Sequence, residues 1–168
     1  MKNVYVYLYN NSVLFEVILF MYFIKSTQNN LFIVAEEKEI ITIEGLKVIT
    51  DYHPDEVNKE DIDVLVITGG EIDNINNKST LNELITFLNS QNKQIGAICA
   101  ARDILFDLKL ITKEDLVSED ILIQNNIIIG PPYKYVDFAI ELGKTMDIYQ
   151  DEDDYKQTIN FFKFFQNV

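Results

Sequence analysis

Short apolar runs alternate with segments of helical periodicity along this chain, and this alternation constrains the fold more than any other feature. The run Val64–Thr68 precedes a helical pattern at Ser79–Gln91, and the run Gln94–Ile98 precedes another at Ala100–Leu108. Continuous apolar runs of this length are typical of strands that are covered on both faces. Strands that alternate with helices predict an α/β protein with a mostly parallel sheet sandwiched by helices.

The same patterns predict the remaining elements. We expect further strands at Lys2–Leu8 and Leu31–Ala35, a hairpin of Ile40–Ile43 with Leu46–Thr50, a hairpin of Ile121–Gln124 with Ile127–Ile129, and helices at Val13–Lys25, Lys134–Met146 and Asp151–Gln166. The chain has 168 residues, of which 48% are apolar, and this is enough for one well-buried core. We therefore expect one domain over residues 1–168, in which 147–168 form an extra C-terminal helix packed on the domain or at a dimer interface.

The composition excludes several kinds of site. Cysteine, histidine and arginine occur once each, as Cys99, His53 and Arg102. One Cys and one His cannot form a disulfide or a structural zinc site, so we expect no metal and no cofactor. The net charge of −13 disfavours nucleic acids and anionic membranes as partners. A small-molecule substrate is the expected partner.

The longest apolar run gives no membrane or export signal. Val13–Ile24 is twelve residues long and contains Glu16, whereas a spanning helix needs roughly 20 apolar residues. A signal peptide would end in a small-residue cleavage site, but Lys25 and further polar residues follow the run. We expect a buried helix in a cytoplasmic protein, where a lone thiol stays reduced.

Three places in the chain follow the carboxyl ends of predicted strands, where parallel sheets bind ligands. They are the turn that leads to Glu16, the pair Gly69-Gly70 and Cys99. The topology would bring these distant segments to one edge of the sheet.

Cys99 lies between a strand and a helix and has small neighbours, as in the sharp turn of a nucleophile elbow. The helix N-terminus would favour its thiolate, and the alternative is an inert core cysteine. Gly69-Gly70 could direct backbone N–H groups into an oxyanion hole, or form an ordinary loop. Glu16 either faces solvent or lies in a cleft with a raised pKa. A protonated Glu16 could donate a hydrogen bond to the Cys99 thiolate.

The sequence resembles the ThiJ/PfpI superfamily, which includes the parkinsonism-associated deglycase and has a flavodoxin-like, class I glutamine-amidotransferase-like fold. The resemblance rests on the opening strand and helix with Glu16, on DIDVLVITGG, on QIGAICAARDIL and on NNIIIGPPYKYVDFAIEL. It implies that Cys99 is the reactive thiol, that Glu16 is a protonated carboxyl in contact with it, and that N–H groups of Gly70 and Ala100 form the oxyanion hole. Members include proteases, amidases, glyoxalase-type enzymes, isonitrile hydratases, chaperones and redox sensors, and most are dimers.

The sequence also departs from the superfamily pattern. Ala101 stands where members usually have glycine, and the segment 110–126 is short and contains no histidine near the cysteine. His53 lies in TDYHPDEV, a region expected away from the crevice and exposed. Without a histidine, peptide hydrolysis becomes doubtful because the leaving amine needs a proton donor.

Arg102 is a cation in the first turn of a helix, where the dipole disfavours it. It either forms a salt bridge with a nearby acid or binds an anion at the mouth of the Cys99 pocket.

Three functions remain open at this point. The first is an enzyme that uses Cys99 and Glu16 on a small carbonyl-like or nitrile-like substrate, as an amidase, hydratase or glyoxalase does. The others are a redox-sensing or stress-related homodimer that uses oxidation of Cys99, and a pseudoenzyme.

Overall fold

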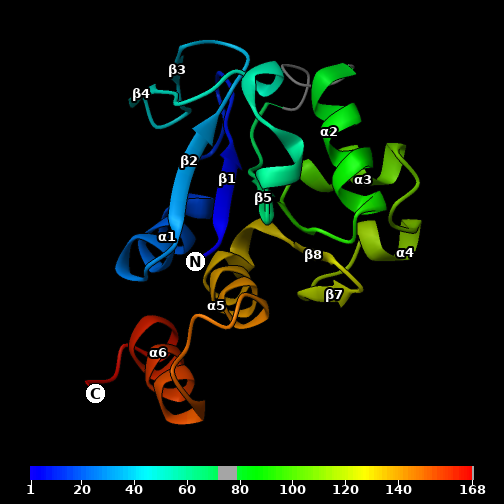
Figure 1. Cartoon of the computed structure of the whole chain (residues 1–168). Coiled ribbons are helices and arrows are strands. Elements are labelled where there is room, and N and C mark those ends of the chain that lie inside the picture. Colours follow the sequence, from blue (N-terminus) through cyan, green and yellow to red (C-terminus); the bar gives the residue numbers. More distant parts are fainter. Residues whose placement is uncertain (72–78, 168) are drawn as a thin grey trace.

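A six-stranded sheet in the order β2-β1-β5-β6-β8-β7 forms the centre of the molecule (Figure 1). The structure is a computed structural model and describes residues 1–71 and 79–167. The strands are β1 (Asn3–Tyr7), β2 (Asn30–Val34), β5 (Val64–Ile67), β6 (Gln94–Ile98), β7 (Leu122–Gln124) and β8 (Ile127–Gly130). All neighbours pair in parallel except β7, which is antiparallel to β8. The predicted mostly parallel sheet is confirmed.

Helices cover both faces of this sheet. They are α1 (Phe15–Ser26), α2 (Ser79–Ser90), α3 (Ala101–Asp107), α4 (Lys113–Leu116), α5 (Tyr135–Thr145) and α6 (Glu152–Phe164). Helix α4 is not among the helices predicted from the sequence. Its signal was present, because Thr112 and Asp115 form a reciprocal capping box at its start.

The alternation of side chains along β1 divides the core into two layers. Tyr5 and Tyr7 join the cluster that contains residues of α2 and α3. Val4 and Val6 join the cluster that contains residues of α1 and α5. Successive side chains of a strand point to opposite faces, so an apolar strand with helices on both sides is buried throughout.

A second sheet is the hairpin of β3 (Glu39–Ile41) and β4 (Lys47–Ile49). Gly45 in its turn has φ +79°, a conformation that favours glycine. The hairpin lies against the start of α1, because Glu44 Oε1 accepts a hydrogen bond from the Phe15 N–H at 2.9 Å. This hairpin also is confirmed.

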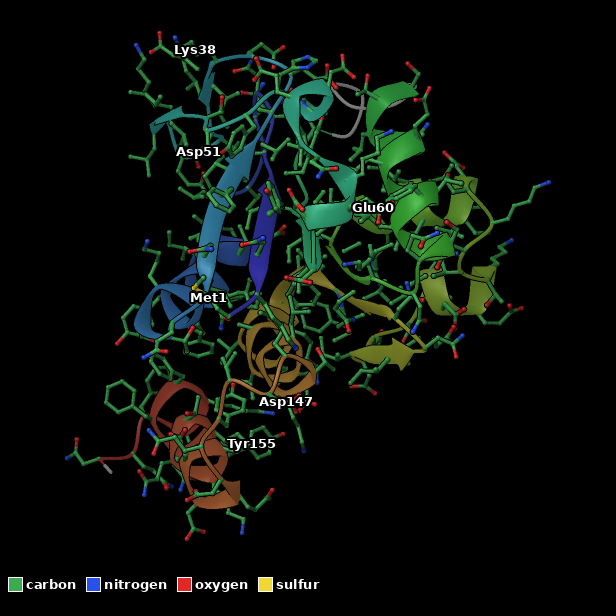
Figure 2. All side chains as sticks on the ribbon, viewed as in Figure 1. Met1, Lys38, Asp51, Glu60, Asp147 and Tyr155 are labelled. Atoms are coloured by element: carbon green, nitrogen blue, oxygen red, sulfur yellow. The ribbon has the colours of Figure 1, made fainter. Side chains whose placement is uncertain are left out.

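The C-terminal helix α6 lies beside α1 and α5 at one end of the molecule (Figures 1 and 2, where Tyr155 is labelled). It has no fully buried residue, and its contacts are made by one face. Phe162 contacts Phe23 of α1 with ring centroids 5.1 Å apart, and the Tyr155 hydroxyl donates to Glu141 of α5 at 2.7 Å.

Among the described residues, every helix is too short or too polar to cross a membrane.

Candidate functional site

Cys99 lies on the turn between β6 and α3 and is half-buried. Its backbone has φ +59°, a left-handed conformation that side chains other than glycine adopt at a cost. The Cys99 N–H donates to the Gly130 carbonyl at 3.0 Å, which ties the turn to the end of β8. The neighbouring strands therefore hold the sulfur in one position at the carboxyl edge of the sheet.

Glu16 lies in the first turn of α1 and is buried, with 2% of its surface exposed. Its Oε2 accepts a hydrogen bond from the Gly69 N–H at 2.9 Å and a longer one from Thr68 Oγ1 at 3.4 Å. Glu16 Oε2 and Cys99 Sγ lie 2.7 and 2.8 Å from the position that a Cβ on Gly69 would take, so the carboxyl group and the thiol are neighbours. Of the two alternatives that the sequence leaves open for Glu16, solvent exposure or a buried position with a raised pKa, the structure shows the second.

Burial is the main cause of the raised pKa values of both the carboxyl group and the thiol. Burial raises the pKa of Glu16 above its usual range, although its hydrogen bonds act in the opposite direction. Burial raises the pKa of Cys99, and the negative charge and hydrogen bond of Glu16 raise it further. The helix N-terminus acts as the sequence suggested, since the Ala100 N–H lowers the pKa of Cys99, but burial and Glu16 outweigh it. Since each negative charge opposes the other, the pair loses its first proton more readily than its second.

The raised pKa of Glu16 gives a testable pH dependence of stability. Below the unfolded pKa of about 4.3 the residue is protonated in both states, so it has no effect there. Above that value the unfolded chain ionises first, and the free energy of unfolding falls by up to about 1.4 kcal/mol per pH unit until the folded pKa is reached. Glu16→Gln should therefore be more stable than the wild type at pH 8, with a smaller difference at pH 5, in urea unfolding.

The matched control is Glu83→Gln, which removes one negative charge from the exposed side of α2. Its free energy of unfolding, relative to that of the wild type, should be nearly the same at pH 5 and pH 8. If Glu16→Gln behaved like this control, the carboxyl group of Glu16 would not be destabilised by burial.

Gly69 and Gly70 have different roles in the structure. The Gly69 N–H is bonded to Glu16, and a Cβ on Gly69 would lie 2.5 Å from Cys99 Cβ and 2.8 Å from its Sγ. Gly70 has φ +142°, and a Cβ there would lie 2.7 Å from Ser12 Cα. Gly69 thus contacts both Glu16 and Cys99, whereas the sequence predicts only that N–H groups of the Gly-Gly pair could form an oxyanion hole.

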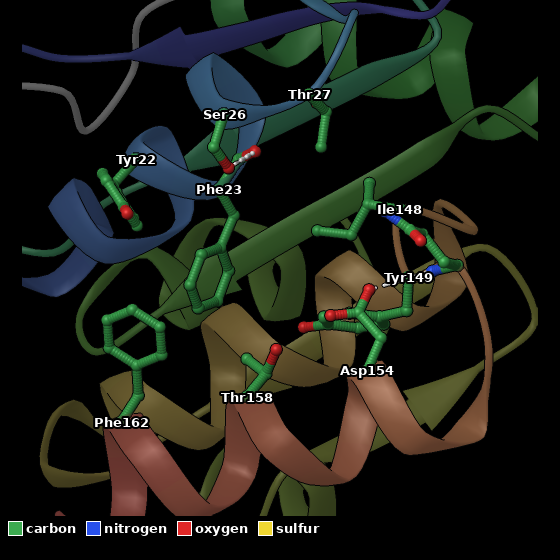
Figure 3. A pocket seen from close by; sticks show the side chains of 10 residues that line it. Tyr22, Phe23, Ser26, Thr27, Ile148, Tyr149, Asp154, Thr158 and Phe162 are labelled. Atoms are coloured by element: carbon green, nitrogen blue, oxygen red, sulfur yellow. Dashed lines mark hydrogen bonds between the residues drawn. The ribbon is translucent and has the colours of Figure 1, made fainter. Parts of the chain in front are cut away.

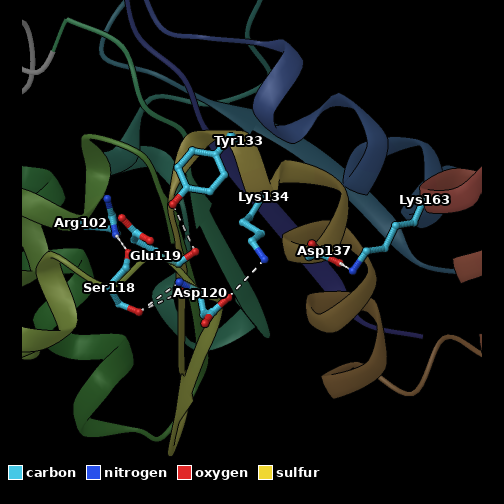
Figure 4. A network of polar contacts seen from close by, with 8 residues as sticks. All are labelled: Arg102, Ser118, Glu119, Asp120, Tyr133, Lys134, Asp137 and Lys163. Carbon is cyan, nitrogen blue, oxygen red and sulfur yellow. Dashed lines mark hydrogen bonds and ion pairs between the residues drawn. The ribbon is translucent and has the colours of Figure 1, made fainter.

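Arg102 bonds to backbone carbonyls, an arrangement that the sequence analysis did not consider. Its Nε donates to the Cys99 carbonyl at 3.1 Å. Its Nη1 donates to the Ser118 carbonyl, also at 3.1 Å (Figure 4). Within the described residues it forms no ion pair within 4.0 Å. Its charge lowers the pKa of Cys99. Arg102 therefore connects the segment after α4, at Ser118, to the turn that contains Cys99.

His53 lies in a different part of the carboxyl edge, after β4. Its Nε2 is 3.1 Å from Glu36 Oε2, and its Nδ1 accepts a hydrogen bond from the Asp55 N–H at 3.2 Å. It caps the short 3-10 helix η1 (Pro54–Glu56), and its side chain is 35% exposed. Its contacts are with acidic residues of this region, and Cys99 is not among them.

Tyr9 is a neighbour of the site that the sequence analysis missed. Its hydroxyl donates to the Thr68 carbonyl at 3.3 Å, at the turn that also holds Gly69. Burial raises the pKa of Tyr9, and the negative charges of Glu16 and Cys99 add to this. Its position directly after the first strand was the signal that could have found it. In the part of the chain that the structure describes, no group of three His, Cys, Asp or Glu side chains is placed to hold a metal ion.

Comparison with known proteins supports one family. The model of the DJ-1/PfpI family matches residues 2–141. The curated proteins include no match. The structure is similar to that of oxidized Toxoplasma gondii DJ-1, with 18% identity, a TM-score of 0.82, and coverage of 95% of this chain and 96% of that chain.

Two further solved structures have the same fold. A DJ-1 superfamily protein from Agrobacterium tumefaciens has 18% identity and a TM-score of 0.83, with coverage of 96% of this chain and 98% of that chain. Drosophila melanogaster DJ-1beta has 17% identity and a TM-score of 0.80, with coverage of 94% and 95%. These likenesses confirm the class I glutamine-amidotransferase-like fold.

Proposed function

The chain belongs to the DJ-1/PfpI family, and from this premise we propose that it is a thiol-dependent enzyme for small substrates with a carbonyl-like or nitrile-like carbon. Cys99 is the nucleophile and Glu16 is the group that handles its proton. The observation that carries the proposal is the pairing of these two groups, a thiol on a strained strand-to-helix turn beside a buried carboxyl group. Strained turns and pKa values shifted by burial are typical of catalytic sites.

The first chemical step with an aldehyde follows from this pair. The sulfur forms a bond to the carbonyl carbon while the thiol proton passes to Glu16, and the electron pair of the C=O bond moves to oxygen. Glu16 then gives the proton to that oxygen, so that an aldehyde and a thiol become a hemithioacetal with all atoms accounted for. A nitrile carbon would form a thioimidate in the same way.

The oxygen that gains negative charge needs donors that are already in place. We propose the N–H groups of Gly70 and Ala100 for this role, the latter because it lies beside the sulfur and lowers the pKa of Cys99. The Gly69 N–H is already used by Glu16. Arg102 contributes positive charge near the site and, through its two carbonyl contacts, fixes the turn.

A panel of small substrates tests the proposal. The purified protein is incubated with an α-oxoaldehyde, a simple aldehyde, an isonitrile and a primary amide, and product formation is followed by proton NMR. We expect turnover of at least one member of the panel. The absence of turnover for every class, in protein whose Cys99 still reacts with iodoacetamide, would refute an enzymatic role on these substrates.

A second candidate function is redox sensing through Cys99. The first support is a half-buried thiol that lies near Glu16, whereas His53 contacts other residues. The second is that one of the compared structures is that of an oxidized DJ-1. Peroxide would transfer one oxygen to the sulfur and leave as water, so the sulfur is oxidised and the peroxide reduced. Low peroxide should then add about 16 or 32 Da to Cys99 in intact-mass spectra. An unchanged mass would exclude this function.

We also propose that the protein is a homodimer. Phe15 and Ile18 of α1 are 48% and 47% exposed, and Ile41, Ile43 and Leu46 on the adjacent hairpin are more than half exposed. The two elements adjoin, because the turn of the hairpin bonds to the first residue of α1. A contiguous apolar surface of this kind is typical of an interface.

Ile18→Glu should convert such a dimer into a monomer, because a charge would be buried at the interface. Light scattering coupled to size exclusion measures the mass directly. The control is Ile123→Glu on β7, which is 48% exposed and lies on the opposite edge of the sheet from β2. A dimer that persists in Ile18→Glu but dissociates in Ile123→Glu would place the interface elsewhere.

A further inference from the structure

A pocket of about 290 Å³ lies between α1, the connection after α5 and the inner side of α6 (Figure 3). Two of its aromatic rings, Tyr22 and Phe23, come from α1, and two, Tyr149 and Phe162, come from the C-terminal part of the chain. The C-terminal wall lies outside the residues that match the family model. The pocket is separate from the Cys99 turn, whose residues do not line it.

The rings form the apolar part of this pocket. Phe162 is the common member, with ring centroids 5.1 Å from Phe23 and 6.0 Å from Tyr22. Figure 3 shows Phe23 and Phe162 directed into the space between the two helices, with Tyr149 on the other side of it. The faces of aromatic rings carry negative charge and attract cations.

Three hydroxyl groups that line the pocket donate to backbone carbonyls. The Ser26 hydroxyl donates to the Phe23 carbonyl at 2.9 Å, and the Thr27 hydroxyl donates to the Ile24 carbonyl at 2.8 Å. The Tyr149 hydroxyl donates to the Ile140 carbonyl at 3.1 Å. The oxygens of Ser26 and Tyr149 therefore keep the capacity to accept from a ligand that donates or is positively charged, whereas Thr27 Oγ1 already accepts from Asn29 Nδ2 at 2.9 Å.

The charge of the pocket has one sign. Asp154 is its carboxylate, and its Oδ2 accepts the Gln150 N–H at 2.9 Å. The described residues that line the pocket include no lysine and no arginine. Three more acids, Asp151, Glu152 and Asp153, precede Asp154, so four acidic residues gather at the start of α6.

We propose that this pocket binds a small organic ammonium ion, with apolar substituents against the rings and its positive charge toward Asp154. Aromatic rings combined with a carboxylate are the chemistry that recognises alkylated amines. The volume fits a compact cation with a few carbons on nitrogen. The pocket is a second site, and its occupancy does not depend on the proposed role of Cys99.

Choline and 3,3-dimethylbutan-1-ol form a matched pair of probes, because the second replaces the charged nitrogen by carbon at equal shape. Their binding to the full chain is measured by saturation-transfer NMR and by calorimetry. Choline should bind about tenfold more tightly than the neutral alcohol. Asp154→Asn, which keeps a side-chain oxygen for the Gln150 N–H, should remove most of that difference and leave the alcohol unaffected.

The controls separate binding from folding and from catalysis. Asp153→Asn removes an equal charge from an exposed position on the same turn, and should weaken choline binding much less. Circular dichroism checks that each variant is folded, and Cys99→Ala should bind choline as the wild type does. Equal affinity for choline and the alcohol, no choline binding at tens of millimolar concentration, or equal effects of the two Asp→Asn changes would each overturn the proposal.

Discussion

Replacing Cys99 by alanine should reduce turnover of any substrate found in the panel by at least about 10³-fold, as expected when a covalent nucleophile is removed. The sulfur is the atom that bonds to the substrate, and the hydroxyl groups at the site donate to backbone carbonyls, Tyr9 to that of Thr68 and Thr68 to that of Val13. Cys99→Ser should be nearly as inactive, because a serine hydroxyl paired only with Glu16 lacks the histidine that usually activates it.

These two variants also separate chemistry from structure. Both keep a side chain on the turn with φ +59°, so the backbone cost of that conformation is the same as in the wild type. Their thermal stability should therefore stay close to that of the wild type while turnover is lost. Turnover that survived in Cys99→Ala would show that the reaction, whatever its substrate, does not pass through this sulfur.

Gly69→Ala should have the second-largest effect. The added Cβ would lie 2.5 Å from Cys99 Cβ and 2.7 Å from Glu16 Oε2, so the sulfur and the carboxyl group must move apart. Displacement of about 1 Å can lower a rate about 10²-fold, and overpacking of this kind costs about 1–3 kcal/mol of stability. Turnover, or iodoacetamide labelling of Cys99 at fixed pH, measures the first effect, and urea unfolding measures the second.

Gly45→Ala is the matched control for this change. Gly45 lies in the turn of the β3–β4 hairpin, and a Cβ there would have no heavy atom within 4 Å. Its φ of +79° makes alanine unfavourable by about 1 kcal/mol, but the reactive pair is not touched. Stability should fall slightly and turnover should not change. Normal turnover in Gly69→Ala would mean that Cys99 and Glu16 need not be in contact for the reaction.

Local sequence patterns predict most of the helices and strands of the fold. Gln94–Ile98 is a strand from its first residue to its last, as predicted, because a short apolar run before a turn has few other ways to be buried. The turn residues Gly45 and Asn125 adopt the positive φ that their hairpins need. The four-residue helix α4 was missed because one turn has no periodicity to detect, although its capping box was in the sequence.

The candidate site was predictable only as a set of positions. Strand ends mark Glu16, Gly69-Gly70 and Cys99, and the parallel pairing of β1, β5 and β6 brings them to one edge. The contacts among them were not predictable, because they depend on the orientation of each side chain and on its hydrogen-bond partners. The assignment of the Gly69 N–H to Glu16, and the carbonyl partners of Arg102, are examples.

The α/β class and the choice of Cys99 as the reactive residue follow from the sequence alone, because apolar periodicity and residue counts can be read without knowing any contact. The surroundings of that thiol depend on the tertiary structure. It pairs Cys99 with Glu16, places His53 on Glu36 and closes an aromatic pocket with α6. Each of these contacts joins residues far apart in the chain or fixes the direction of a side chain, and only the packing of the strands and helices supplies that information.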